Sequence, residues 1–255
     1  MKYKLTAFLL LLFPLISKQV KGIYMQENQT NFENSVFAIV KISFNKVGET
    51  PVEGGICGTA FLINDSTAIT ANHVLNGSNY LPNPGYKYVQ YWLMKRGTKK
   101  IIELKKDDLQ SLPEIESTFI KLNVKFIIGY NLCAQVFKIN DFVLNYGHIS
   151  NMPITKAHWE NKLIIDDYTL EMSKSDKMGT ILSLTQATIN SQDLHIIDKA
   201  VIQPSFIANI GMSGGPLISQ NNIIGLMSFG LPADSTIKKE VYAISINEVI
   251  KLIKK

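Results

Sequence analysis

Short apolar segments, rich in β-branched and aromatic residues, alternate with clusters of turn-forming residues along most of the chain. Val36–Phe44 is the first such segment, and Gly58–Ile63 and Ala68–Ala71 flank a turn cluster at 64–66. Residues of the first kind favour strands, whereas Asn, Asp and Ser favour the turns between them. Many short strands at this spacing predict an all-β sandwich or barrel. Further strands are predicted at 87–95, 119–128, 133–139, 179–189, 194–203, 216–219, 223–229 and 240–246.

The C-terminal tail carries the best helix signal. Ser245 can cap a helix over Ile246–Lys255, and Glu248 follows it at capping-box spacing. One face of that helix is apolar, formed by Ile246, Val249, Ile250 and Ile253. We therefore expect a short terminal α-helix on an otherwise β-sheet chain.

The N-terminus has the pattern of an export signal. Lys2 and Lys4 precede an apolar run of twelve residues, Leu5–Ile16. This run is shorter than the roughly 20 residues of a membrane span, and it predicts a signal peptide over 1–22. The signal peptide predicts a secreted or periplasmic protein. The alternative is that the segment remains as an uncleaved N-terminal anchor.

The formal net charge of +5 is largely a property of that first segment. Four lysines and no acidic residue lie within 1–22, so the remaining chain carries +1, which is 5 minus 4. A charge this small gives no reason to expect a nucleic-acid partner.

The two cysteines, Cys57 and Cys133, allow two interpretations. An exported chain can join them in a disulfide, and two buried free thiols are equally compatible with the sequence. No His lies at zinc-ligand spacing from either, and no nucleotide-binding glycine loop occurs, so we expect neither metal nor cofactor.

Gly211–Leu217 is the first segment that suggests chemistry. Its Gly-Met-Ser-Gly-Gly-Pro-Leu sequence surrounds Ser213 with glycines, which permit a tight turn and close approach of a substrate. The N–H groups of Gly211 and Ser213 could then bind a developing oxyanion. The alternative is a glycine-rich turn that contains a serine by chance.

His73 is the second candidate, because among four histidines it alone follows a predicted hairpin of small and apolar residues. The other three lack such a setting and are interpreted as surface or structural residues: His148, His158 and His195.

Together, Gly58–Ile63, Thr70–Val74 and Gly211–Leu217 resemble the trypsin-like (chymotrypsin-fold) serine peptidases, in the same chain order. The Asn-His-Val at His73 is similar to the bacterial HtrA-like branch, here without a PDZ domain. The resemblance implies two antiparallel six-stranded β-barrels, at 23–145 and 146–255, with the active site between them.

The resemblance also implies an Asp between the His and the Ser, which would orient the imidazole. Asp141, followed by three apolar residues, is the predicted third member of the triad and is expected in the N-terminal barrel. Two pairs remain as alternatives: Asp107 with Asp108, and Asp166 with Asp167.

Substrate contacts follow from the same resemblance. Ser228, Phe229 and Gly230 are expected to pair with the substrate backbone. Ile207 stands six residues before Ser213, where a pocket acid would select basic side chains, so an apolar or small P1 residue is preferred. Met212 replaces the Asp that binds a new N-terminus in zymogens, and therefore we expect no such activation.

The predicted function is a secreted serine endopeptidase that acts through Ser213, His73 and Asp141 and an acyl-enzyme. Its partners would be protein or peptide substrates, with no nucleic acid and no stable membrane association after signal cleavage. The alternative is a catalytically inactive domain of the same fold, serving as a binding or adhesion module.

Overall fold

The computed structural model describes residues 32–49, 52–76, 81–96, 101–128, 130, 132, 134, 136–150, 158–159, 163–164, 173–190, 195–231 and 240–253. The predicted signal peptide at 1–22 lies outside these ranges. Within them, no helix has both the length and the apolar character needed to cross a membrane.

The N-terminal half forms one antiparallel sheet of seven strands in the order β5-β4-β1-β2-β3-β7-β6. Its strands are β1 Val36–Phe44, β2 Val52–Asn64, β3 Thr67–Ala71, β4 Tyr88–Lys95, β5 Ile101–Leu104, β6 Leu109–Leu112 and β7 Ser117–Lys121. Three short turns of helix accompany them: α2 Asn72–Leu75, η2 Lys106–Asp108 and η3 Pro113–Ile115.

Strand β1 is central because both of its faces are buried. Phe37 and Ile39 pack into one apolar cluster with Leu62, while Val40 and Ile42 pack into another. The strand pairs with β2 on one side and β4 on the other, with a register shift between Ile39 and Val40. A near-continuous apolar sequence therefore suits this position.

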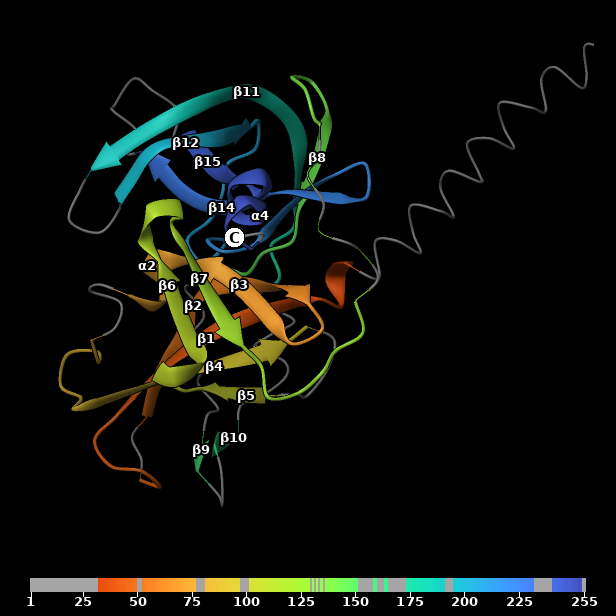
Figure 1. Cartoon of the computed structure of the whole chain (residues 1–255). Helices are drawn as coiled ribbons and strands as arrows, with labels where there is room; N and C mark the ends of the chain where they lie inside the picture. Colours follow the sequence, from red (N-terminus) through yellow and green to blue (C-terminus); the bar gives the residue numbers. More distant parts are fainter. Residues whose placement is uncertain are drawn as a thin grey trace, which may run out of the picture.

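The C-terminal half closes into a six-stranded barrel in the order β11-β12-β15-β14-β13-β8. Its strands are β8 Phe142–Asn145, β11 Lys177–Asn190, β12 His195–Pro204, β13 Pro216–Ser219, β14 Asn222–Leu231 and β15 Glu240–Ser245. Helix α4, Ile246–Ile253, follows β15, and a separate two-stranded pair comprises β9 His158–Trp159 and β10 Leu163–Ile164. Figure 1 shows the barrel above the seven-stranded sheet, with α2 at the boundary between them.

The architecture confirms the predicted chymotrypsin-like, all-β fold with a short terminal helix, and it corrects three details. The first sheet has seven strands rather than six. Strand β8 lies within the predicted first barrel, 23–145, yet it belongs to the second, because Phe142–Asn145 pairs with β11 and β13. The predicted strand at 133–139 is absent over the residues described there, 134 and 136–139, where Val136 is fully exposed.

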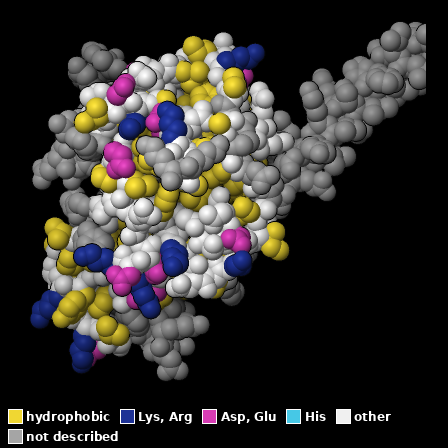
Figure 2. Space-filling model, in the orientation of Figure 1, with side chains coloured by type: hydrophobic (Ala, Val, Ile, Leu, Met, Phe, Trp, Pro, Cys, Tyr) yellow, Lys and Arg dark blue, Asp and Glu magenta, His cyan; other side chains and the backbone are white. Residues whose placement is uncertain are grey.

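Charged side chains of both signs are interspersed on the face seen in Figure 2, with hydrophobic side chains between them. Several large hydrophobic residues are exposed on the second barrel and near its loops, among them Phe142, Met178, Leu182, Ile207 and Ile210.

Candidate active site

His73 lies at the end of the first sheet because α2 begins directly after β3. Strand β3 pairs with β7 along its whole length, so that Ala71 faces Ser117. Glu116 comes directly before β7, and its carbonyl accepts the N–H of Asn72 at 3.0 Å. This pairing brings Glu116 against the first turn of α2.

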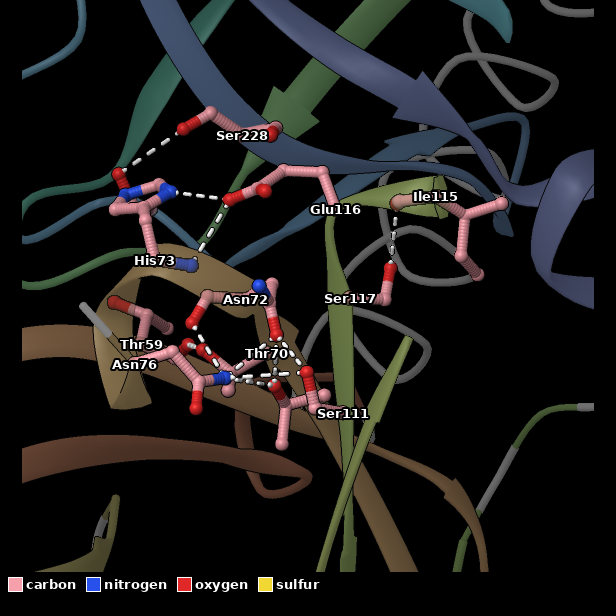
Figure 3. Close-up of polar contacts among 12 residues, drawn as sticks. Thr59, Thr70, Asn72, His73, Asn76, Ser111, Ile115, Glu116, Ser117 and Ser228 are labelled. Carbon is pink, nitrogen blue, oxygen red and sulfur yellow. Dashed lines mark hydrogen bonds and ion pairs between the residues drawn. The ribbon is translucent and has the colours of Figure 1, made fainter. Parts of the chain in front are cut away.

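Glu116 binds His73 through one carboxylate oxygen. Its Oε1 lies 2.6 Å from Nδ1 of His73 and also accepts the backbone N–H of His73 at 3.0 Å (Figure 3). The carboxylate is 1% exposed, and Glu116 has left-handed backbone angles, φ 50° and ψ 43°. Such a conformation is costly for a residue with a Cβ and often marks a functional position. Because a carboxylate only accepts, Nδ1 of His73 is the donor in this contact, and Nε2 is the ring nitrogen on the side away from Glu116.

Asn72 ties α2 to the strands beside it. Its Oδ1 accepts hydrogen bonds from Ser111 on β6 at 2.6 Å and from Thr118 on β7 at 3.0 Å. The Nδ2 of Asn76 donates to the same oxygen at 2.6 Å, and Figure 3 shows this cluster beneath the His73–Glu116 pair. The helical turn that carries His73 is therefore held from both of its ends.

Asp141 lies elsewhere, and the predicted pairing with His73 is corrected here. Its carboxylate accepts the N–H of Lys138 at 2.9 Å, in the turn that leads into β8 of the second barrel. The alternatives Asp107 and Asp108 lie in η2, which precedes the first residue of β6, whereas α2 lies near the last residues of that strand. Asp166 and Asp167 lie outside the described residues. The sequence prediction was limited to Asp, whereas the residue that contacts His73 is Glu116, directly before the strand Ser117–Lys121.

Ser213 lies in the loop before β13, which we call the nucleophile loop, residues 209–215. Its carbonyl accepts the N–H of Thr59 on β2 at 2.8 Å. Gly214 has φ +87°, and a Cβ there would overlap the Thr59 carbonyl and the Thr70 hydroxyl and crowd the backbone N of Ala71. Only glycine allows this approach. It brings Gly214, the neighbour of Ser213, against Ala71, which lies two positions before His73.

The backbone of the nucleophile loop leaves two donors available. Met212 N–H donates to Asn209, Gly214 N–H to Met227, and Gly215 N–H back to Met212. Among the described residues, neither Gly211 N–H nor Ser213 N–H has an acceptor. Gly211 has φ +99°, and its carbonyl accepts the Thr59 hydroxyl at 2.8 Å. The loop is thus fixed by its neighbouring groups, while the two predicted oxyanion donors remain free.

Ser228, Phe229 and Gly230 lie on β14 beside Ser213. The Ser213 hydroxyl donates to the Ser228 carbonyl at 3.3 Å, the contact drawn from Ser228 in Figure 3. On one side Phe229 and Gly230 pair with β15. On the other, the β13 ladder ends at the pair Pro216–Leu226, so this part of β14 has an open edge in the described structure.

Other predicted residues take varied positions. The side chain of Ile207 is exposed, and that of Met212 is buried. His148 is fully buried, and burial, Arg96 and Lys174 together hold its pKa well below the usual range; its role is structural. Side chains at His158 and His195 lie outside what is described.

No metal site is found among the described residues, in which His, Cys, Asp and Glu do not gather in threes. Cys57 is a free thiol that donates to the Ile39 carbonyl at 3.5 Å, and burial raises the pKa of this thiol to about 12. Cys133 lies outside the described residues.

The fold is that of known serine proteases. A structure of a variant of the HtrA-type protease AlgW with a decapeptide superposes with a TM-score of 0.62 at 14% identity, over 90% of this chain and 65% of that one. The active form of the Rv3671c protease from M. tuberculosis gives 0.55 at 17% identity, over 89% and 83%. The MamO protease domain from Magnetospirillum magneticum gives 0.54 at 12%, over 84% and 95%.

This chain spans about two thirds of the AlgW chain that it resembles. No family model matches it, and no curated protein does either. The likeness is therefore one of fold.

Proposed function

We propose that the chain is a serine endopeptidase in which Ser213 is the nucleophile, His73 the general base and Glu116 the residue that orients the base. The observation that carries the proposal is the contact of 2.6 Å between Nδ1 of His73 and the buried carboxylate of Glu116. A nucleophile, a base and a group that orients the base are the three parts of this chemistry, whatever their positions in the sequence.

In the proposed reaction, His73 Nε2 removes the hydroxyl proton of Ser213 as Oγ attacks the carbonyl carbon of the peptide. The Glu116 carboxylate holds the imidazole in the required tautomer and stabilises the imidazolium that forms. His73 then gives its proton to the leaving amine, which departs and leaves an acyl-enzyme. Water, activated by His73, hydrolyses that ester and restores Ser213.

The N–H groups of Gly211 and Ser213 are the proposed oxyanion donors. Their lack of an acceptor in the described structure supports this role, because a donor that is already bonded would have to be released first. One such donor typically contributes a factor of about 10²–10³ to the rate.

The open edge of β14 at Ser228, Phe229 and Gly230 is the proposed binding site for an extended peptide, which would add a strand there. The structural neighbours support a peptide substrate, since AlgW structures contain a decapeptide and a tripeptide. The exposed Ile207 offers no carboxylate for a basic P1 side chain, which keeps an apolar or small P1 residue as the proposed preference.

Export, as proposed from the pattern of residues 1–22, would place the enzyme outside the cytoplasm. Its substrates would then be secreted or periplasmic polypeptides.

The test uses a fluorophosphonate probe, which reacts with an activated serine. Purified protein should be labelled, Ser213→Ala should not be labelled, and a peptide map should place the modification on Ser213. Ser205→Ala is a matched control, since Ser205 lies in the same barrel on an exposed turn, and its labelling should equal that of the parent. Folded protein that resists labelling would instead favour the inactive binding module.

A further inference from the structure

The nucleophile loop rests on a second segment, residues 173–176, which we call the support segment. The hydroxyl of Ser175 accepts a hydrogen bond from Nδ2 of Asn209 at 3.0 Å and lies 3.9 Å from the sulfur of Met212. The same sulfur lies 3.1 Å from the backbone N of Asn209. Ser175 therefore contacts Asn209 and Met212, which lie before and after Gly211 in the loop.

Backbone hydrogen bonds join these two segments through a third, residues 147–150. Ser175 N–H donates to the carbonyl of Gly147 at 2.9 Å, and Ile149 N–H donates to that of Ser173 at 2.8 Å. Ser150 N–H in turn donates to the carbonyl of Ile210 at 2.7 Å. A displacement of the support segment would thus be transmitted to the peptide bond between Ile210 and Gly211.

The support segment is tied to the other half of the molecule by Arg96. Nη2 of Arg96 lies 2.8 Å from Oδ1 of Asp176 and 3.5 Å from the carbonyl of Gly147. Arg96 directly follows β4, its backbone N–H donates to Val36 at 3.0 Å, and its side chain is fully buried. The guanidinium also lies over the ring of Tyr146, at 5.5 Å from the centroid.

Electrostatics explain why Arg96 pairs with Asp176. A guanidinium keeps its charge at all ordinary pH values, and a buried charge is unfavourable without a partner. Asp176 gives that partner, at hydrogen-bond distance, whereas Glu33 approaches Arg96 only to 4.0 Å and instead binds Lys174 at 3.2 Å. The Asp176 side chain is 39% exposed, and therefore its substitution leaves no new cavity.

We infer that the Arg96–Asp176 ion pair is a positioning device for the oxyanion hole: through Ser175 it holds the nucleophile loop in the arrangement that directs the N–H groups of Gly211 and Ser213 to the substrate. This inference rests on the proposed function. It gives the nucleophile loop an internal anchor that comes from the first sheet.

The test compares Asp176→Asn with the parent protein in two independent measurements. In hydrogen–deuterium exchange, a peptide that covers 207–215 should exchange at least threefold faster in the variant, while a peptide that covers 68–76 should not change. In cleavage of a peptide substrate, kcat should fall roughly tenfold with KM within twofold, because oxyanion donors act on the transition state. Asp176→Glu, which keeps the charge, should recover most of both.

Glu33→Gln is the matched control: it removes the other carboxylate near Arg96, together with its contact to Lys174 of the support segment, and it leaves the Arg96–Asp176 ion pair in place. It should alter neither the exchange of 207–215 nor kcat. Unchanged exchange of 207–215 in Asp176→Asn would overturn the inference, as would an equal effect of Glu33→Gln. Because exchange needs no catalysis, this result is independent of the proposed function, which fails separately if the parent protein is neither labelled nor active.

Discussion

One oxygen of Glu116 contacts His73 twice, at Nδ1 over 2.6 Å and at the backbone N–H over 3.0 Å. The two contacts fix both the position of the residue and the plane of its ring. A glutamate is one methylene longer than the aspartate usual in such a triad. Here the left-handed backbone at Glu116, between η3 and β7, sets the direction in which that longer side chain leaves the chain.

Glu116→Gln should abolish most of the activity without unfolding the protein. The amide keeps the shape of the carboxylate but cannot stabilise an imidazolium, and it can favour the wrong tautomer of His73. By analogy with the same change in other triads, kcat should fall by about 10³–10⁴, measured with a peptide substrate at pH 8.

Asp141→Asn is the control for that experiment, because it makes the same chemical change at the residue that sequence reasoning favoured. Its kcat should stay within about twofold of the parent, since Asp141 binds the Lys138 amide in a turn of the other barrel. A loss of activity in Asp141→Asn that matched Glu116→Gln would contradict the proposed triad.

Gly214→Ala should destabilise the protein and prevent labelling of Ser213. An alanine Cβ would overlap the Thr59 carbonyl and the Thr70 hydroxyl, at a position that already requires φ +87°. Strain and overpacking together should lower the free energy of unfolding by about 3 kcal/mol. Urea denaturation measures this loss.

Gly48→Ala separates the effect of backbone strain from that of overpacking. Gly48 has a similar φ of +84°, but nothing lies within 4 Å of the position of its Cβ. The free energy of unfolding of Gly48→Ala should therefore fall only by the cost of a left-handed backbone at alanine, about 1 kcal/mol. Equal losses in the two variants would mean that the close approach between the halves of the molecule contributes nothing.

Much of the fold could be predicted from the sequence because its signals are local. Apolar β-branched segments predicted most strands, and Ser245 with Glu248 predicted α4, which the structure forms over Ile246–Ile253. The placement of β8 could not be predicted in this way. Phe142–Asn145 is a short strand between two halves, and only its long-range pairing with β11 decides to which barrel it belongs.

The candidate site was likewise predicted only in part from the sequence. Ser213 and His73 stand in recognisable local patterns, and the structure places both at the boundary between the two halves. Glu116 was missed because its role depends on the β3–β7 pairing, which sets Ala71 opposite Ser117. The support from Arg96 depends on a contact across 80 residues of sequence, for which the sequence carries no local signal.

Cys57 should resist alkylation in the native protein. Burial raises the pKa of this thiol to about 12, and only the thiolate reacts. With iodoacetamide at pH 8, a peptide that contains Cys57 should be modified at least 100-fold more slowly in native protein than in 6 M guanidinium chloride. Mass spectrometry locates the modification at each cysteine separately. Rapid native modification of Cys57 would show that its sulfur is accessible.

His148 should make the protein less stable as the pH falls below about 6.5. Burial, Arg96 and Lys174 lower the pKa of His148 in the folded chain. Above the ordinary pKa, folded and unfolded chains both hold a neutral imidazole, and stability is unaffected. Below it the unfolded chain binds a proton that the folded chain does not, and the free energy of unfolding decreases. The ordinary pKa of the unfolded chain limits this decrease to at most about 1.4 kcal/mol at pH 5.5.

His148→Asn isolates that contribution, because its amide can replace Nδ1 in the contact with Ser173 at 3.0 Å and does not titrate. Urea denaturation of both proteins at pH 7.5 and 5.5 gives the change in stability with pH for each. The carboxylates of the same cluster, Glu33 and Asp176, are present in both proteins, and subtraction removes their contribution. The parent should lose more stability than the variant, by at most about 1.4 kcal/mol. Equal losses would mean that His148 takes up a proton in the folded state as readily as in the unfolded one, and that it is not held neutral beside Arg96 and Lys174.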